Sequence, residues 1–287
     1  KTQYSYNPRN FMIENIVTTR GNVMLQNMEY EYDGKCNMTS RCDLKNYNCE
    51  EFEYDSYDRL TKMILNGEVT GMMKYHTNGN ITEKTINGVK VMYNTTYAGN
   101  KPNAIVSVRS EDEKMYDRFK QKIEYSLDKA ISIEDDGDIL IMDYGYDNSR
   151  IYMSAKIDGK IKEKFYVGNC EFVIDDNKAN YLTYLEGPMG VFAVCVSNSS
   201  ATTVNYILKD NLESWNIITD KDGKVIEERN FDAWGNMRDS KTWSKDADIK
   251  TLMFDRGFTG HEHLVSFGLI NMNGRLYDPL TSMMLSP

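Results

Sequence analysis

The sequence is poor in the residues on which most active sites depend. Its 287 residues include only three histidines, five cysteines and five prolines. It contains no Cys-x-x-Cys pair, no Gly-x-Ser-x-Gly elbow, no phosphate-binding loop and no dinucleotide fingerprint. We therefore expect no zinc knuckle, no serine hydrolase and no bound cofactor, and we expect this chain not to act as an enzyme by itself.

Long apolar runs and a basic surface are also missing. No stretch of about 18 apolar residues occurs, so we expect no membrane-spanning helix. The 34 basic and 43 acidic residues give a net charge of −9. Because phosphate binding depends on clustered lysine and arginine, we expect no nucleic-acid partner. The chain opens at Lys1 rather than at methionine, and we expect it to be a piece of a longer protein.

Alanine, the best helix former, is scarce, whereas tyrosine, which suits half-buried strands, occurs 20 times. Pairs of asparagine or aspartate with glycine supply the positive φ angles of tight hairpins. They are Asp33-Gly34, Asn66-Gly67, Asn78-Gly79, Asn87-Gly88, Asp136-Gly137, Asp158-Gly159, Asp222-Gly223 and Asn273-Gly274. The sequence therefore predicts an all-β fold of strands joined by short turns.

The five cysteines, an odd number, match no metal-binding spacing. They are Cys36, Cys42, Cys49, Cys170 and Cys195. We expect small, buried or half-buried strand residues. A disulfide that closes a hairpin, either Cys36–Cys42 or Cys42–Cys49, remains open for a secreted chain. A catalytic thiol is the least favoured alternative, because no histidine is indicated nearby.

A short motif recurs along the chain. An aromatic residue and an aspartate are followed by two variable residues, a glycine, aspartate or asparagine, a basic or amide residue and an aliphatic one. Its copies begin at Tyr32-Asp33, Tyr54-Asp55, Tyr75 (with Gly79), Tyr146-Asp147 and Phe231-Asp232 (with Trp234 and Gly235). The first three copies are 22 and 21 residues apart, which indicates an internal repeat.

The motif has the chemistry of a strand, a turn and a returning strand. The aromatic residue ends a strand facing the core, and the aspartate accepts hydrogen bonds from backbone N–H groups two residues on. Glycine or asparagine takes the left-handed position, so we expect positive φ at Gly79 and Gly235. A single hairpin cannot bury its apolar side alone. We therefore predict hairpins stacked into one continuous curved sheet.

Two stretches are less clear. Residues 98–139 form either a short helix, with a capping box at Ser110 to Glu113 and Met115, Phe119 and Ile123 at helical spacing, or a strand pair with a polar loop. Residues 161–174 alternate between apolar and polar around Phe165, Val167, Cys170, Phe172 and Ile174, with a turn at Gly168-Asn169.

The repeated motif resembles the YD repeat of the RHS family, which includes bacterial RHS toxins and is related to animal teneurins. Residues 210–214, 219–225 and 232–236 resemble the family's ordered C-terminal stretch, with Asn211 and Glu213 in place of the usual histidine and glycine. Residues 256–264 and 267–279 resemble the RHS repeat-associated core domain in its Bacteroidetes-type form. The resemblance covers roughly residues 28–97 and 140–287.

The resemblance implies an organisation and a role. Residues 1–110 correspond to YD-repeat hairpins, 111–230 to a divergent continuation of the sheet, and 231–287 to the core-associated segment that closes one end, all in one continuous unit. We expect a structural piece of a shell on a secreted or cell-surface bacterial protein. The shell would enclose or present its own C-terminal effector and contact neighbouring repeats. The alternative is a binding module whose exposed tyrosines hold a carbohydrate or a cell-surface protein.

The resemblance also implies a candidate catalytic residue, Asp278. In toxin-bearing members, the core domain is an aspartate-dependent self-cleaving protease. Its motif is matched here by Arg275, Tyr277, Asp278 and Pro279, and further on by Ser286 and Pro287, although Ser282-Met283 replaces the usual Gly-Arg pair. The second aspartate of the motif would follow Pro287. Self-cleavage needs two carboxylates that share a proton, so we expect this chain to be inactive as a protease.

We expect Arg275 to lie beside Asp278 and both to face the enclosed side. The alternative is that Asp278-Pro279 simply begins a turn after the Tyr277 strand.

His261 and His263 are two residues apart and would share one face of a strand, as metal ligands can. No third ligand is indicated, so structural hydrogen bonding is the favoured interpretation and we predict no metal. Asp220 to Gly223 resembles the start of a calcium loop, but the glutamate that such a loop needs at its twelfth position is missing. A hairpin turn is therefore expected there.

Overall fold

The computed structural model describes residues 1–99, 101, 103–244 and 252–285. The chain divides into two compact units. Unit 1 comprises Lys1–Phe119 and the described part of Asp239–Asp246, and unit 2 comprises Lys120–Arg238 and the described part of Ala247–Pro287. Strands account for 59% of the chain and helices for 4%, which confirms the all-β prediction. Among the described residues, no helix has the length and apolar character needed to cross a membrane.

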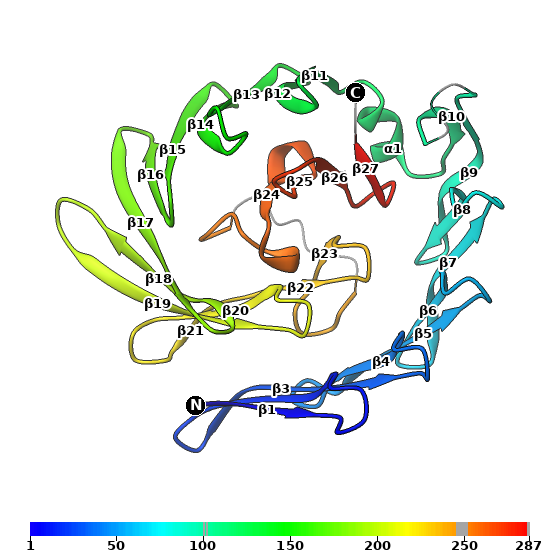
Figure 1. The fold of residues 1–287 in the computed structure, drawn as a ribbon, viewed down its shortest axis with the longest axis horizontal. Coiled ribbons are helices and arrows are strands. Elements are labelled where there is room, and N and C mark those ends of the chain that lie inside the picture. The colour runs from blue at the N-terminus through cyan, green and yellow to red at the C-terminus, as the bar shows by residue number, and fades with distance from the viewer. Residues whose placement is uncertain (100, 102, 245–251, 286–287) are drawn as a thin grey trace. The chain divides into compact units, whose positions relative to one another are not determined.

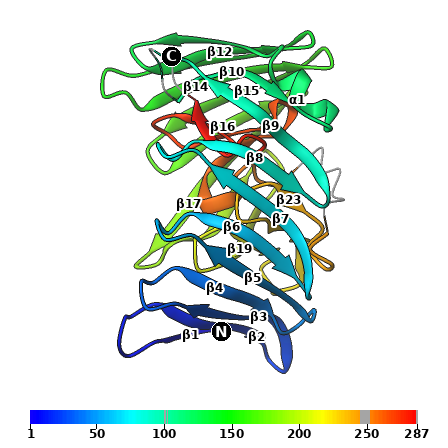
Figure 2. The same cartoon turned by 90° about the vertical axis from the view of Figure 1, so that its right-hand side faces the viewer.

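Unit 1 is built on one ten-stranded sheet in which every strand pairs antiparallel with its neighbour in the chain (Figure 2). Its strands are β1 (Thr2–Tyr6), β2 (Ile13–Arg20), β3 (Val23–Tyr32), β4 (Met38–Asp43), β5 (Asn48–Tyr54), β6 (Leu60–Leu65), β7 (Glu68–Tyr75), β8 (Ile81–Ile86), β9 (Val89–Tyr97) and β10 (Ile105–Arg109). Consecutive pairing is what stacked hairpins require, so the predicted repeat architecture holds for this unit.

Unit 2 continues the same scheme with eleven strands, and its sheet curves around the C-terminal segment (Figure 1). The strands are β11 (Lys122–Ser126), β12 (Lys129–Asp135), β13 (Asp138–Tyr144), β14 (Arg150–Ile157), β15 (Lys160–Val167), β16 (Cys170–Asp175), β17 (Lys178–Gly187), β18 (Gly190–Ser197), β19 (Thr202–Lys209), β20 (Trp215–Thr219) and β21 (Val225–Glu228). A two-stranded ladder, β22 (Asn230–Phe231) with β23 (Met237–Arg238), follows the sheet.

Residues 252–285 lie against the concave face of the unit 2 sheet (Figure 1) and are called the inner segment here. It holds a four-stranded sheet and two short 3-10 turns. Its elements are η1 (Phe258–Gly260), β24 (Glu262–Leu264), η2 (Val265–Phe267), β25 (Leu269–Asn271), β26 (Leu276–Asp278) and β27 (Met283–Leu285). Leu264, Phe267, Leu269 and Leu276 pack on Leu140 and Met142 of the large sheet to form the main core.

The less clear stretch at 98–139 contains both of the structures considered for it. A single short helix, α1 (Glu113–Arg118), buries Met115, and strands β10, β11 and β12 flank it. The N-cap is Asp112, whose side chain accepts the backbone N–H of Lys114, rather than Ser110. The helix ends before Ile123, which belongs to β11.

Tight two-residue turns close one set of hairpins. At Asn66-Gly67, Asn87-Gly88, Asp136-Gly137 and Asp158-Gly159 both residues have positive φ, as the inverse turns between twisted strands require. The expectation was wrong for Gly34 and Gly274, which do not have positive φ. Positive φ angles occur at Cys36 and Asn273 instead. At Asp33 the chain makes a longer turn, and the fourth residue of that turn, Cys36, takes the left-handed conformation.

The second kind of turn spans five residues and is held by an aspartate. Its carboxylate accepts the backbone N–H groups two and four residues further on, at distances of 2.8–3.1 Å. This holds for Asp33, Asp55, Asp210, Asp220 and Asp232. The fourth residue is left-handed, and φ is 94° at Gly79 and 86° at Gly235, which confirms both expectations. In the Tyr75 copy, His76 takes the place of the aspartate. The copy of the motif expected at Tyr146-Asp147 was wrong, because the turn there begins at Gly145, so that Tyr144 ends the strand and Tyr146 is exposed.

Tyrosines that precede the five-residue turns fix successive repeats to one another. Each ends a strand and donates its hydroxyl to a backbone carbonyl 14 to 16 residues earlier, at the start of the strand that follows the preceding turn. The bonds run from Tyr54 to Met38 (2.7 Å), Tyr75 to Leu60 (2.6 Å), Tyr97 to Ile81 (2.6 Å) and Tyr144 to Ala130 (2.9 Å). Burial raises the pKa of Tyr75 and of Tyr97 to about 12, so both hydroxyls stay protonated at neutral pH.

The expectation for the cysteines holds for four of them and was wrong for Cys36. Cys42 and Cys49, directly paired across β4 and β5, form a disulfide, which is the second of the two pairings considered. Cys170 and Cys195 are half-buried strand residues, and Cys36 is exposed in a turn.

Arg41 anchors the returning segment, residues 239–244, to the sheet of unit 1. It forms a buried ion pair with Glu50 (2.7 Å). Its guanidinium also lies 5.6 Å from the ring of Phe52 and 5.5 Å from that of Trp243, which is 3% exposed. A buried arginine between two aromatic faces is a favourable cation–π arrangement. The segment is therefore held to β4 and β5 by its tryptophan.

We predict that Tyr75→Phe lowers the free energy of unfolding by about 0.5–1.5 kcal/mol, because it removes the hydrogen bond from the tyrosine hydroxyl to the Leu60 carbonyl. Equilibrium unfolding in urea measures this change. Tyr57→Phe is the matched control, since Tyr57 is 79% exposed, and it should change stability by less than about 0.5 kcal/mol. Equal effects of the two substitutions would contradict the role given to the hydroxyl.

Candidate functional site

A cluster of buried charges joins the inner segment to the large sheet of unit 2. The Lys164 ammonium on β15 lies 2.6 Å from a carboxylate oxygen of Glu262, 2.6 Å from one of Asp255 and 3.5 Å from one of Glu171. The side chains of Lys164, Glu171 and Glu262 are each at most 5% exposed. Asp255 and Glu262 belong to the inner segment, and Lys164 and Glu171 belong to the sheet.

Further groups surround this cluster on the sheet side. Arg150 forms an ion pair with Glu262 and stacks over the ring of Tyr166 at 4.3 Å. The Tyr166 hydroxyl donates to Glu262 (3.0 Å), and Lys162 pairs with Asp255 (3.0 Å). On the inner segment, Arg256 pairs with Glu171 (3.1 Å). Every carboxylate therefore faces at least one cation from the opposite layer, as buried charges require.

The electrostatics of the cluster keep its groups ionised. Burial by itself would raise the pKa of Glu262, but Arg150 and Lys164 outweigh it and hold that pKa well below its ordinary value. The pKa of Asp255 is lowered in the same way, with Lys164 as the main opposing charge. The pKa of Lys164 is raised well above its usual value, because its carboxylate neighbours outweigh the effect of burial. The cluster is thus a network of ions at neutral pH.

The sequence contains a signal for this cluster in the alternation at residues 161–174. The alternation at residues 161–174 is present, with the turn at Gly168. The apolar residues Phe165 and Phe172, however, lie on the outer face, and Lys164 and Glu171 point inward. Lys164 and Glu171 face inward because the charged side chains that pair with them belong to the inner segment, about 90 residues further along the chain. In this stretch the charged residues, and not the aromatic ones, therefore mark the inward face.

Asp278 ends strand β26 and is 1% exposed. Its carboxylate accepts the backbone N–H of Leu280 (3.0 Å) and the hydroxyl of Thr281 (2.9 Å). The aspartate therefore does begin a turn, and it is buried at the same time. Arg275 is exposed, and the described residues show no side-chain contact between it and Asp278. The expected pairing was wrong, because Arg275 lies in the exposed turn before β26, whereas Asp278 is buried at the end of that strand.

The last copy of the turn motif packs against the Asp278-Pro279 step. The Asn236 amide donates to the carboxylate of Asp232 (2.9 Å) and to the backbone carbonyl of Pro279 (3.2 Å). The Tyr277 hydroxyl donates to the backbone carbonyl of Trp234 (2.9 Å). Gly235 has no room for a side chain, since a Cβ there would lie 2.6 Å from the Phe258 ring. The structure thus brings Asp232, Trp234 and Gly235 to Asp278, whereas Ser286 and Pro287 lie outside the described residues.

The two histidines near Glu262 are held by hydrogen bonds. His263 is buried and its Nε2 accepts the backbone N–H of Phe258 (2.9 Å), so that nitrogen has no lone pair left for a metal. Burial and the nearby Arg229 lower the pKa of His263 to about 3, which keeps the ring neutral. His261 Nδ1 lies 2.8 Å from the Thr259 hydroxyl. Among the described residues, no three histidine, cysteine or acidic side chains are placed to hold a metal ion.

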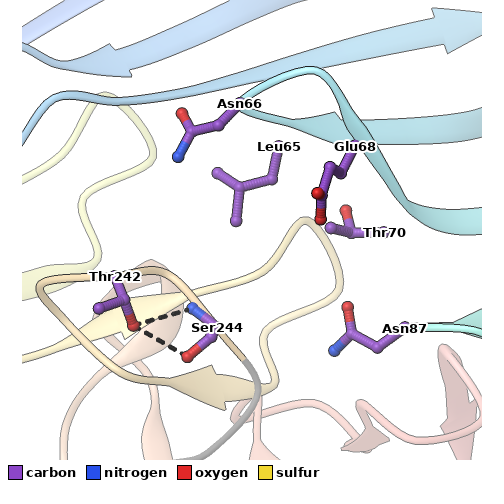
Figure 3. A pocket seen from close by; sticks show the side chains of 7 residues that line it. All are labelled: Leu65, Asn66, Glu68, Thr70, Asn87, Thr242 and Ser244. Atoms are coloured by element: carbon purple, nitrogen blue, oxygen red, sulfur yellow. Dashed lines mark hydrogen bonds between the residues drawn. The ribbon is translucent and has the colours of Figure 1, made fainter.

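Unit 1 contains a hollow of about 610 Å³ beside the turns at 66–67 and 87–88 (Figure 3). Its lining is mostly hydroxyl and amide groups, from Leu65, Asn66, Glu68, Thr70, Asn87, Thr242 and Ser244. Glu68 is the single ionisable side chain among them. The hydroxyl and amide groups of its lining can form hydrogen bonds with a polar molecule.

No protein-family model and no curated protein matches the chain. Solved structures do match. The crystal structure of TcdB2-TccC3-Cdc42 is 17% identical and has a TM-score of 0.79, over 99% of this chain and 17% of that one. A Tc holotoxin pore from Photorhabdus luminescens is 16% identical and has a TM-score of 0.76, over 99% of this chain and 16% of that one. Our chain spans about a sixth of their length, and the likeness supports an RHS-type fold.

We predict that Lys164→Met destabilises the protein by about 3–5 kcal/mol at pH 7, because it leaves buried carboxylates without their shared cation. Carboxylates whose pKa is lowered on folding stabilise the protein above their unfolded pKa of about 4, and this contribution is lost as the pH falls. The gap between the variant and the parent should therefore narrow below about pH 4. Urea unfolding at several pH values measures both effects.

Lys122→Met is the control for this substitution, since Lys122 is an exposed lysine 3.9 Å from Glu134 in the same unit. Its effect should stay below about 1 kcal/mol, as expected for a surface ion pair. A Lys164→Met protein as stable as the parent, or a gap that widens in acid, would contradict the ionic network.

Proposed function

We propose that this chain is a structural segment of an RHS-type shell on a secreted or cell-surface bacterial protein. In this proposal the shell encloses or presents the protein's own C-terminal effector, and the segment has no enzymatic activity by itself. The observation that carries the proposal is the likeness to TcdB2-TccC3 over 99% of the chain, inner segment included. One of the matching structures is described as TcdB2-TccC3 without its hypervariable C-terminal region.

The construction of the sheet also supports a structural role. Asx turns, tyrosine hydroxyls and consecutive antiparallel pairing repeat through both units, and each of these devices stabilises the sheet rather than exposing a reactive group. The charged side chains whose pKa values shift strongly, Lys164, Glu262 and Arg256, belong to one cluster, where each faces an opposite charge. Shifted pKa values arise in structural ion networks as well as in active sites. Here the geometry favours the structural role.

Limited proteolysis of the natural full-length protein tests the enclosure. We expect any segment that follows residue 287 to be digested at least about tenfold more slowly inside the full-length protein than when it is expressed alone, because a protease reaches an enclosed chain only after the shell opens. A full-length Lys164→Met variant should lose part of this protection. Equal digestion rates, or a natural protein that carries nothing after residue 287, would overturn the enclosure.

Self-cleavage is a second candidate function, and the burial of Asp278 beside the Asp232 turn favours it. The carboxylate is removed from water and fixed by Thr281, as a proton-transferring group must be. In this candidate the second carboxylate comes from residues that follow Pro287. The chain described here would then supply half of a two-aspartate site.

In the full-length protein we expect Asp278→Asn to abolish any cleavage downstream of the core, because an amide cannot exchange the proton. The turn should survive, since an amide oxygen still accepts the Leu280 N–H. Gel analysis and intact mass measure the cleavage. Asp147→Asn, which changes an exposed turn carboxylate, is the control and should leave it unchanged. Unaltered cleavage in Asp278→Asn, or a parent protein that is not cut, would reject this candidate.

A further inference from the structure

Four asparagines of the chain are followed directly by glycine, and such pairs are chemically labile. They are Asn66, Asn78, Asn87 and Asn273, and all four are exposed to water. Since the residue that follows is glycine in every case, the sequence alone does not distinguish them. The hydrogen bonds of the folded chain do.

The reaction of such a pair is an intramolecular substitution. The backbone nitrogen of the glycine attacks the side-chain carbonyl carbon of the asparagine, the new C–N bond closes a five-membered succinimide, and ammonia leaves. Water then opens the ring at one of its two carbonyls, which gives aspartate or isoaspartate. Glycine has no side chain to hinder the attack. The reaction therefore needs a carboxamide that can turn toward the glycine and a glycine N–H that can lose its proton.

Two of the four carboxamides are already held by hydrogen bonds. The Asn66 oxygen accepts the backbone N–H of Cys49 (2.8 Å), and its nitrogen donates to the side chain of Asn48 (3.2 Å). The Asn78 oxygen accepts the backbone N–H of Asn80 (3.2 Å) and lies 3.0 Å from Nδ1 of His76. Either side chain must give up these contacts before it can turn toward its glycine.

Two of the four glycine N–H groups are held as well. Gly79 donates to the backbone carbonyl of His76 (3.0 Å), and Gly274 donates to that of Met272 (2.6 Å). The nitrogen that would attack is thus engaged in the pairs that begin at Asn78 and Asn273. Of the four pairs, only Asn87-Gly88 remains without such a constraint.

Asn87 and Gly88 form the two-residue turn between β8 and β9, with φ angles of 48° and 77°. The backbone N–H of Asn87 donates to the carbonyl of Thr70 (2.8 Å), which holds the residue in place. In the part of the chain that the structure describes, neither the Asn87 carboxamide nor the Gly88 N–H has a hydrogen-bond partner. Asn87 also lines the hollow of unit 1, where its side chain has space to turn (Figure 3).

We propose that Asn87 is a site of spontaneous deamidation, and that its isoaspartate product loosens the hairpin of β8 and β9. Isoaspartate routes the main chain through the β-carbon and so lengthens the turn. A two-residue turn between the paired residues Ile86 and Val89 cannot take up an extra backbone atom and keep its geometry. The new carboxylate also shares the hollow with Glu68, and the two like charges repel. This modification is independent of the proposed shell role.

Peptide mapping by mass spectrometry of the chain, aged in mildly alkaline buffer, tests the site. We expect Asn87 to deamidate at least about tenfold faster than Asn66, Asn78 or Asn273, because each of those pairs must first break one or more hydrogen bonds. In chain unfolded with guanidinium chloride the four asparagines should react at similar rates, which separates the effect of the fold from that of the sequence.

Two variants test the product. Asn87→Gly keeps a pair of residues that tolerate positive φ but removes the reactive carboxamide, so labelling by an isoaspartyl methyltransferase should fall to a small fraction of that of the aged parent. Asn273→Gly is the matched control and should leave the labelling unchanged. In the aged parent the amides of β8 and β9 should exchange hydrogen faster than in aged Asn87→Gly, while those of β2 and β3 should keep their rates. Circular dichroism confirms that each variant is folded.

The proposal is overturned if Asn66, Asn78 or Asn273 reacts as fast as Asn87 in the folded chain, or if Asn87 stays intact while the unfolded chain is converted. Equal exchange of β8 and β9 in aged parent and aged Asn87→Gly would reject the loosening of the hairpin. None of these outcomes affects the proteolysis test of the shell, because that test concerns the segment that follows residue 287.

Discussion

The position of the inner segment depends on the Lys164 ammonium and the buried carboxylates around it. Removing such groups from water is costly, and only close pairing with opposite charges compensates for it. Lys164 contacts Asp255 and Glu262 at 2.6 Å each, so a shift of the inner segment by one residue would leave these charges unpaired. The network therefore favours the observed position of β24 against the face of the large sheet over positions shifted along it. Apolar packing of Leu264 and Phe267 on Leu140 supplies attraction but tolerates such shifts more easily.

Once β24 is fixed, the rest of the inner segment follows from it. His263 is held neutral behind Glu262, where it accepts the Phe258 N–H. Strands β25 and β26 pair outward from β24 and bring Tyr277 and Asp278 to the last copy of the turn motif. Asn236 then connects that turn to Pro279. The same Asx turn that stacks hairpins in the sheet thus positions a buried aspartate, which joins the repeat architecture to the part of the chain with a candidate catalytic residue.

The turns and the strand content could be predicted from the sequence, whereas ion pairs between residues far apart in the chain could not. The turns at Gly79 and Gly235 and the all-β fold follow from side chains within five residues of one another. The predicted pairing of Arg275 with Asp278 was wrong, because Arg275 belongs to the exposed turn that precedes β26 and only Asp278 belongs to the strand. The Lys164 cluster was missed because its partners are 91 and 98 residues away, and no periodic pattern connects them. The alternation around Phe165 also did not show which face of the strand the inner segment would cover. Apolar residues usually mark the covered face, but here the inner segment carries Asp255 and Glu262 and therefore covers the face with Lys164.

The most direct test of this account is native-state hydrogen exchange on the backbone amides of β24 and β25. If the ionic network fixes the inner segment to the sheet, amides such as those of His263 and Ile270 should exchange as slowly as those of β14 and β15 in the parent protein. In Lys164→Met they should exchange faster, while the amides of β5 and β6 in unit 1 should keep their rates. Fast exchange of β24 in the parent, or an unchanged pattern in the variant, would contradict the account.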